Sequence, residues 1–258
     1  MLAVVTGASS GIGLELARVL AQNDYDLLIA AEDAAIEEAA TTLRAEGADV
    51  EAVRADLSTH DGVERLVAAI DRDPDVVALN AGVGVGGPFA ETDLDRELAM
   101  IDLNVKSVVH LTKRLLPRML ARGEGRLLYT ASIASAMPAP FELVYGGTKA
   151  FVLMFAEGLR NELKDTGVVV TAFMPGPTAT EFFARADMLD TKAGQRESQD
   201  DPADVARQAF GALQAGKDAA VVGSLSTRMQ GRMNEVMPET AKAAAHRRLS
   251  EPGSGTGE

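Results

Sequence analysis

The sequence predicts a single α/β domain in three layers, in which a doubly wound parallel sheet of about seven strands lies between two layers of helices. Two observations predict this fold. Short apolar runs rich in β-branched residues alternate with stretches of helical periodicity over residues 1–223, which is typical of parallel strands joined by helical crossovers. Turns rich in glycine or proline follow several of these runs, at the edge where open α/β sheets place ligands.

Composition excludes several classes of function. The chain of 258 residues contains no cysteine, which excludes disulfides, thiolate nucleophiles and cysteine-bound zinc. The net charge of −13 argues against nucleic-acid binding. His60, His110 and His246 are too far apart for a local metal motif, and we expect no metal. Without a long apolar run or a signal-peptide pattern at the start, we expect a cytoplasmic protein that does not bind membranes.

The first strand, over residues 2–5, runs into a turn with glycines at positions 7, 11 and 13, and a helix follows. Glycine lets the backbone turn sharply and approach a ligand closely. The free N–H groups at the helix start suit a pyrophosphate. No Lys-Ser or Lys-Thr follows the last glycine, so this is not a P-loop. A plain turn is the alternative, but the position favours dinucleotide binding.

Residues 26–31 are the predicted second strand, and residues 36–46 the following helix. The end of this strand is where an acidic residue can hold the adenine ribose, or an arginine a 2′-phosphate. Here the chain has Ala31, Glu32 and Asp33 and no arginine. This favours NAD over NADP, with two solvated carboxylates at a helix start as the alternative.

The third strand, residues 50–53, precedes Asp56 and a helix over residues 61–71. Asp56 is a candidate acceptor for the adenine amine, or equally a turn or capping carboxylate. A fourth strand, residues 75–79, ends at Asn80, and a glycine-rich segment follows. We expect the Asn80 side chain to bond to neighbouring backbone, which is a structural role.

Residues 93–122 read as one long helix whose apolar stripe is interrupted by Asn104. That amide is either satisfied locally or anchors water near a reaction centre. Pro117 should kink or end the regular part of the helix. A fifth strand, residues 125–132, carries Ser132 at its carboxyl end, so Ser132 should face the same crevice as the first glycine turn.

Tyr145 and Lys149 are four residues apart in the next predicted helix, so both side chains project from one face of it. A free tyrosine has a pKa of ~10, and a nearby ammonium should lower that pKa toward the range of a base. A surface Tyr-Lys pair without chemistry is the alternative.

The remaining elements follow the same alternation. They are a strand at 167–174, a long segment at 181–201 expected to be a lid or disordered, a helix from 201, a strand at 219–223, and a helical extension at 224–250 interrupted by Pro238. Residues 251–258 are predicted to be a disordered tail.

Six motifs together resemble the single-domain short-chain dehydrogenases/reductases. They are Thr6-Gly7-x-x-x-Gly11-x-Gly13, Asn80-Ala81-Gly82, Asn104, Ser132, Tyr145-x-x-x-Lys149 and Pro175-Gly176, in that family's order and spacing. Two details depart from it: Leu79 stands where the family often has Asn, and Gly146-Gly147 where it often has Ala or Ser. Neither removes a reacting group.

The resemblance implies a Rossmann-type fold and an NAD(P)-dependent oxidoreductase for a secondary alcohol or ketone. Tyr145 would be general acid and base, and Lys149 would bind the nicotinamide ribose and lower the pKa of the tyrosine. Ser132 would bind the substrate oxygen, and Asn104 would hold a water. The alternatives are a non-catalytic NAD(P)-binding regulator and, remotely, a serine hydrolase, which lacks its G-x-S-x-G motif here.

The resemblance also implies a cofactor site and an assembly. The cofactor is NAD or NADP, since Ala31-Glu32 fits neither family pattern. The cofactor-binding residues are Gly7, Ser9, Ser10, Gly11, Ile12, Gly13, Ala31, Glu32, Asp56, Leu57, Asn80, Ala81, Gly82, Tyr145, Lys149, Pro175, Gly176, Thr178 and Thr180. Independently of the resemblance, the apolar residues Val83, Val85, Phe89, Met137, Pro138, Pro140, Phe141, Phe182 and Met188 favour a fairly apolar substrate, with plain packing of apolar loops as the alternative. A homodimer or homotetramer would use the helices at 93–122 and 145–164.

Overall fold

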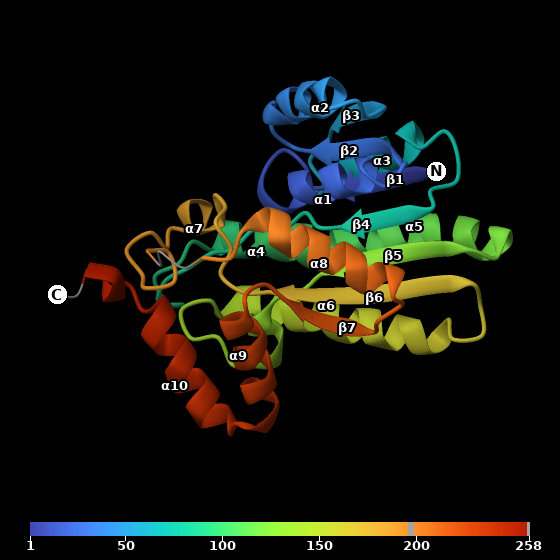
Figure 1. Ribbon diagram of the computed structural model, residues 1–258. Coiled ribbons are helices and arrows are strands. Elements are labelled where there is room, and N and C mark those ends of the chain that lie inside the picture. The colour runs from blue at the N-terminus through green and yellow to red at the C-terminus, as the bar shows by residue number, and fades with distance from the viewer. Residues whose placement is uncertain (196–198, 257–258) are drawn as a thin grey trace.

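The computed structural model describes residues 1–195 and 199–256. In this part of the chain seven parallel strands form one sheet in the order β3-β2-β1-β4-β5-β6-β7 (Figure 1). The strands are β1 (Leu2–Thr6), β2 (Asp26–Ala31), β3 (Val50–Arg54), β4 (Val76–Leu79), β5 (Gly125–Thr130), β6 (Val168–Pro175) and β7 (Ala219–Val222). The predicted doubly wound parallel sheet is confirmed, and strand boundaries agree within two residues.

Strand β1 lies inside the sheet and pairs on both sides. Its residue Val4 is in register with Leu28 of β2 and with Val77 of β4. Strands β2 and β3 are added on one side of β1, and β4 to β7 on the other, so the connections after β1 and β4 lead to opposite sides. The loops that leave their carboxyl ends open a crevice at this switch point, which is where this architecture binds ligands.

Helices cover both faces of the sheet. The helices are α1 (Gly11–Ala21), α2 (Ala35–Ala45), α3 (His60–Ala69), α4 (Leu94–Ile101), α5 (Ser107–Arg122), α6 (Leu143–Glu162), α7 (Phe182–Arg185), α8 (Pro202–Gln214), α9 (Leu225–Val236) and α10 (Glu239–Ser250). Alternating strand residues divide between two cores. Val4 and Leu28 pack with α3, α5 and α6, whereas Val5 and Ile29 pack with α1, α2 and α8. The three predicted layers are thus present.

The stretch at 93–122 is not the single helix that its periodicity predicts. A π-helical segment, Asp102–Lys106, separates α4 from α5. Pro117 lies inside α5, which continues to Arg122 and ends at Gly123 with a φ of 77°. The expectation that Pro117 could end the helix was wrong. Pro117 is exposed, so water can solvate the carbonyl group that loses its hydrogen bond.

The last third of the chain is more ordered than expected. In the 181–201 segment Phe183 and Met188 are buried in a small apolar cluster, although positions 196–198 lie outside the described residues. Residues 251–256 differ from the expected disordered tail, because the N–H of Gly255 donates to the carbonyl oxygen of Asp190 at 2.8 Å and a short 3-10 helix forms at Ser254–Thr256. Positions 257 and 258 also lie outside the described residues.

Pro238 separates α9 from α10, as predicted for the extension at 224–250. Among the helices of the described residues, none has both the length and the apolarity that crossing a bilayer requires.

Candidate active site

A cavity of about 250 Å³ runs along the carboxyl edge of the sheet, above β1, β4, β5 and β6. Every residue that the sequence assigns to cofactor binding lines this cavity, from Gly7 to Thr180, and so does Ser132. Asn104 lies behind its wall. Segments far apart in the sequence therefore converge on one site, as the strand order requires.

The turn after β1 forms a cradle that only glycine allows. Gly7 has a φ of 65°, and a Cβ there would lie 2.8 Å from the Cα of Ala81. A Cβ on Gly13 would lie 2.0 Å from the carbonyl oxygen of Gly7. Gly11 has a φ of 55°, a region that side chains disfavour. These glycines therefore let the turn pack tightly against the rest of the chain, and they line the cavity at the start of α1, where the free N–H groups suit a pyrophosphate.

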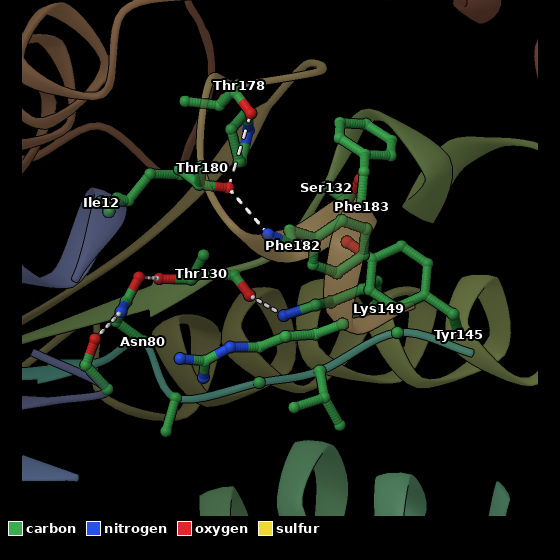
Figure 2. Close-up of a pocket in the computed structure, with 18 of the residues that line it drawn as sticks. Ile12, Asn80, Thr130, Ser132, Tyr145, Lys149, Thr178, Thr180, Phe182 and Phe183 are labelled. Carbon is green, nitrogen blue, oxygen red and sulfur yellow. Dashed lines mark hydrogen bonds between the residues drawn. The ribbon is translucent and has the colours of Figure 1, made fainter. Parts of the chain in front are cut away.

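A hydrogen-bond network ties the ends of β1, β4 and β5 together. The Thr6 hydroxyl accepts from the N–H groups of Asn80 and Ala81 at 2.9 and 3.0 Å. The Asn80 amide donates to the carbonyl oxygens of Thr6 and Gly7 and accepts from the Thr130 hydroxyl at 3.0 Å. Figure 2 shows the link between Asn80 and Thr130. The structural role expected for Asn80 is present; Thr130 was not predicted.

The carboxylates of Glu32, Asp33 and Asp56 line the far end of the cavity. The Ser9 hydroxyl donates to Asp33 Oδ2 at 3.1 Å, while the buried Asp33 Oδ1 has no hydrogen-bond partner among the described residues. Arg185 of α7 reaches within 3.7 Å of Asp33 Oδ2, a cation that the sequence did not place here. Asp56 accepts from the N–H and hydroxyl of Ser58, so the turn role that the sequence left open is present.

Tyr145 and Lys149 both lie on α6 and point into the cavity with Ser132 (Figure 2). Their exposed fractions are 9%, 5% and 8%. Lys149 Nζ donates to the carbonyl oxygen of Thr130 at 2.9 Å and lies 5.9 Å from the centroid of the Tyr145 ring. The Ser132 hydroxyl accepts from the N–H of Ala134, which fixes it at the start of a 3-10 turn, Ile133–Ala136.

Burial controls the ionisation of this pair. It raises the pKa of Tyr145 well above its usual value, the negative charge of Glu142 raises that pKa further, and a hydrogen bond with Ser132 opposes the rise. Burial also lowers the pKa of Lys149 to about 8. The predicted lowering of the tyrosine pKa by Lys149 is therefore not seen, because the removal of the phenol from water dominates its ionisation.

Asn104 lies in the π-helical segment, a feature that often marks functional sites. Its Oδ1 accepts from the N–H of Val83 at 3.0 Å, and its Nδ2 donates to the Val83 carbonyl and to Thr148 Oγ1. The amide is thus satisfied within the chain, which was one of its two expected roles. A Cβ on Gly82 would lie 3.1 Å from both Asn104 Oδ1 and Lys149 Nζ, so Gly82 lets the two side chains approach the same point.

The apolar wall of the cavity is only partly as expected. Val83, Met137 and Phe182 line it, and the Phe182 ring centroid is 5.1 Å from that of Tyr145. Phe89, in contrast, is 60% exposed. Other expected members, Val85, Pro138, Pro140, Phe141 and Met188, do not line the cavity. Sequence reasoning missed the wall residues Glu142, Phe183, Gln230, His246, Leu249 and Ser250.

Two of the three histidines come together, although the sequence separates them. The rings of His60 and His110 have centroids 4.8 Å apart, and His110 Nε2 lies 2.7 Å from Glu64 Oε1. These groups on α3 and α5 are close enough to share a metal ion. Arg114 Nη2, 2.9 Å from Glu64 Oε2, competes for the carboxylate. None of these residues lines the cavity.

Known proteins resemble both this sequence and this structure. A family model described as short chain dehydrogenase matches residues 1–189. A relative, 1-deoxy-11-beta-hydroxypentalenate dehydrogenase of Streptomyces exfoliatus, is 39% identical over 185 residues, which cover 69% of this chain and 67% of the relative.

Two solved structures extend the likeness to cofactor complexes. A short-chain dehydrogenase from Sphingobium yanoikuyae in complex with NADPH has a TM-score of 0.79 at 28% identity, covering 85% of this chain and 87% of the other. A Burkholderia phymatum short chain dehydrogenase/reductase in complex with NAD has a TM-score of 0.76 at 28% identity, covering 85% and 88%.

Proposed function

This chain belongs to the short-chain dehydrogenase/reductase family and is an NAD(P)-dependent oxidoreductase, and on that premise we propose that it interconverts a secondary alcohol and its ketone with Tyr145 as general acid and base. The convergence of Ser132, Tyr145 and Lys149 in one buried cavity carries this proposal. The bound nicotinamide supplies or accepts the hydride.

The chain's own groups handle the proton and the substrate oxygen. In reduction the Ser132 hydroxyl holds the carbonyl oxygen, and the Tyr145 phenol donates its proton to that oxygen as the carbon gains the hydride. In oxidation Tyr145 takes the proton back. The raised pKa of Tyr145 keeps the phenol protonated at neutral pH, which supports the role of acid. Lys149, whose pKa burial lowers to about 8, would return a proton to the tyrosine.

The residues at the sheet edge fit a dinucleotide. The cradle of Gly7, Gly11 and Gly13 would hold the pyrophosphate, because these residues line the cavity at the start of α1. Thr178 and Thr180 would meet the carboxamide. The carboxylate of Asp33, whose Oδ1 has no hydrogen-bond partner among the described residues, favours ribose hydroxyls over a 2′-phosphate. Arg185 beside it is paired with Glu181 at 2.7 Å, so we propose a preference for NAD. Titration with NADH and NADPH measures it, and tighter binding of NADPH would contradict it.

The mechanism is tested with two tyrosine variants. Alcohols and ketones are first screened with both cofactors by nicotinamide absorbance. With the best substrate, Tyr145→Phe should lower kcat by about 10²–10⁴-fold and leave cofactor affinity unchanged. Tyr129→Phe is the matched control, since Tyr129 is a fully buried phenol bonded to Thr112 at 2.9 Å outside the cavity. Full activity in Tyr145→Phe would refute the mechanism.

We also propose a homodimer or homotetramer that uses α4, α5 and α6. Exposed apolar side chains on two of these helices support the proposal: Leu94 and Leu98 on α4 are 69% and 50% exposed, and Met154 on α6 is 59% exposed. Apolar surface of this kind often marks an interface between proteins. Gly147 has open space around its Cβ position, which agrees with a close approach between chains there.

A further inference from the structure

Helix α10 lies over the substrate end of the cavity. Figure 1 shows it beside α9, below the sheet. Lys242 Nζ donates to the carbonyl oxygen of Ala136 at 3.3 Å, and the Arg247 guanidinium lies 5.0 Å from the centroid of the Phe141 ring. These contacts hold α10 against the loop between Ser132 and α6. The family match ends at residue 189, so this wall lies outside the part of the chain that the family model covers.

Three polar side chains meet where α10 reaches the cavity, and we call them the polar cluster. Glu142 Oε2 accepts from the Ser250 hydroxyl at 2.8 Å and lies 3.0 Å from His246 Nε2. The Ser250 hydroxyl is 3.2 Å from the same nitrogen. Glu142 and Ser250 are only 6% and 2% exposed, yet all three residues line the cavity. A buried carboxylate is therefore placed inside the catalytic cavity.

The polar cluster has unused hydrogen-bonding capacity. The hydrogen bonds of this cluster use Glu142 Oε2 and His246 Nε2, and within the described part of the chain no hydrogen bond reaches Glu142 Oε1 or His246 Nδ1. The surrounding wall is apolar, with Met137, Phe182 and Leu249. In such surroundings an unpaired carboxylate oxygen strongly favours a hydrogen-bond donor.

The charge of the polar cluster restricts which donor fits. Glu142 is close enough for its negative charge to act on Tyr145, so an anionic substrate group would be repelled by the same charge. A cationic group would share the cavity with Lys149. A neutral hydroxyl meets neither charge penalty, and it can donate its proton to Glu142 Oε1 or to the Nδ1 atom of His246.

We propose that the polar cluster of Glu142, His246 and Ser250 is a substrate subsite for a hydroxyl group that the substrate carries in addition to its reacting oxygen. The substrate class is then a hydroxyketone or the corresponding diol, bound between apolar walls, rather than a wholly apolar ketone. This inference rests on the proposed function, because the cavity must be the place where the carbonyl group reacts.

The test compares ketones of one carbon skeleton that end in a methyl, a hydroxymethyl or a carboxylate group, in a series of chain lengths. At the best length the hydroxymethyl compound should exceed its methyl partner in kcat/KM by about tenfold or more, as expected for one hydrogen bond to a charged group. Glu142→Gln should lower that ratio about tenfold, mainly through KM. Arg248→Ala, on the exposed face of α10, should leave the ratio unchanged.

The possible results distinguish a failure of the hydroxyl subsite from a failure of the proposed oxidoreductase function. If wild-type protein transfers hydride to no ketone of any kind, the proposed function fails and the inference with it. If it turns over ketones without preferring a hydroxyl at any length, or prefers the carboxylate, the inference alone is overturned. An unchanged ratio in Glu142→Gln also overturns it. Should that variant not fold, Ser250→Ala must lower the ratio for the inference to stand.

Discussion

The hydroxyl of Thr6 should contribute far more stability than one threonine usually does. Thr6 is 1% exposed, and its Oγ1 accepts from the N–H groups of Asn80 and Ala81 while donating to the carbonyl oxygen of Ala78 at 3.3 Å. Thr6→Val keeps the shape and removes the oxygen, which leaves two backbone donors without an acceptor. At about 1–3 kcal/mol for each of these two unsatisfied groups, the free energy of unfolding should fall by about 2–6 kcal/mol.

Urea unfolding of the protein without cofactor measures this change, because bound cofactor would add its own stabilisation. Thr171→Val is the matched control. Thr171 is 0% exposed, and among the described residues its hydroxyl makes one hydrogen bond, which it donates to the carbonyl oxygen of Lys217 at 2.7 Å. Its loss should cost about 1 kcal/mol. Equal losses in the two variants would refute the reasoning that the Thr6 hydroxyl joins β1 to β4.

Three further variants test the cavity and the surface. Gly13→Ala, whose Cβ would lie 2.0 Å from the Gly7 carbonyl, should weaken cofactor binding in a titration at least about tenfold, whereas Gly147→Ala, with open space, should not. Lys149→Met should be more stable than wild type at pH 7 by up to about 3 kcal/mol. Burial lowers the pKa of Lys149 from its usual 10.5 to about 8, so the stability of the wild type should rise as the pH increases from 8 to 10.5. The stability difference between the variant and the wild type should shrink over the same range. A stability difference that does not change with pH would contradict this. Met154→Glu should reduce the particle mass in light scattering, and an unchanged mass would exclude that surface from the assembly.

Much of the fold could be read from the sequence because its determinants are local. The apolar run at Leu2–Thr6 and its glycine turn carry their own signal, and α8 begins at Pro202 as predicted. The π-helical segment at Asp102–Lys106 gave no such signal, since the apolar spacing on either side of it looks helical. The behaviour of Pro117 depends on which side of α5 faces water, and that is decided by packing.

In the candidate site, too, the residues that form local motifs could be predicted, and those that only the fold brings together could not. The spacing of Tyr145 and Lys149 and the glycines after β1 were visible as motifs, and the structure brings them into one cavity. The polar cluster was not visible, because His246 contacts Glu142 across 104 positions of sequence. The direction of the Tyr145 pKa was predicted wrongly for a related reason: spacing shows the neighbouring amine, but only the packed structure shows how completely both groups are removed from water.

The π-helical segment makes chain length, rather than residue type, the constrained quantity in this part of the protein. One extra residue in a helix rotates everything after it by about 100°, and a π turn absorbs such a residue locally. Here α4 packs on α6 while α5 packs on α3. Each of α4 and α5 must therefore be rotated about its axis so that its apolar face meets its own neighbour. A single deletion between 102 and 106 would force one helix out of phase with its neighbour, even if every remaining side chain were conserved. Homologous or designed sequences should therefore be compared here by residue count first.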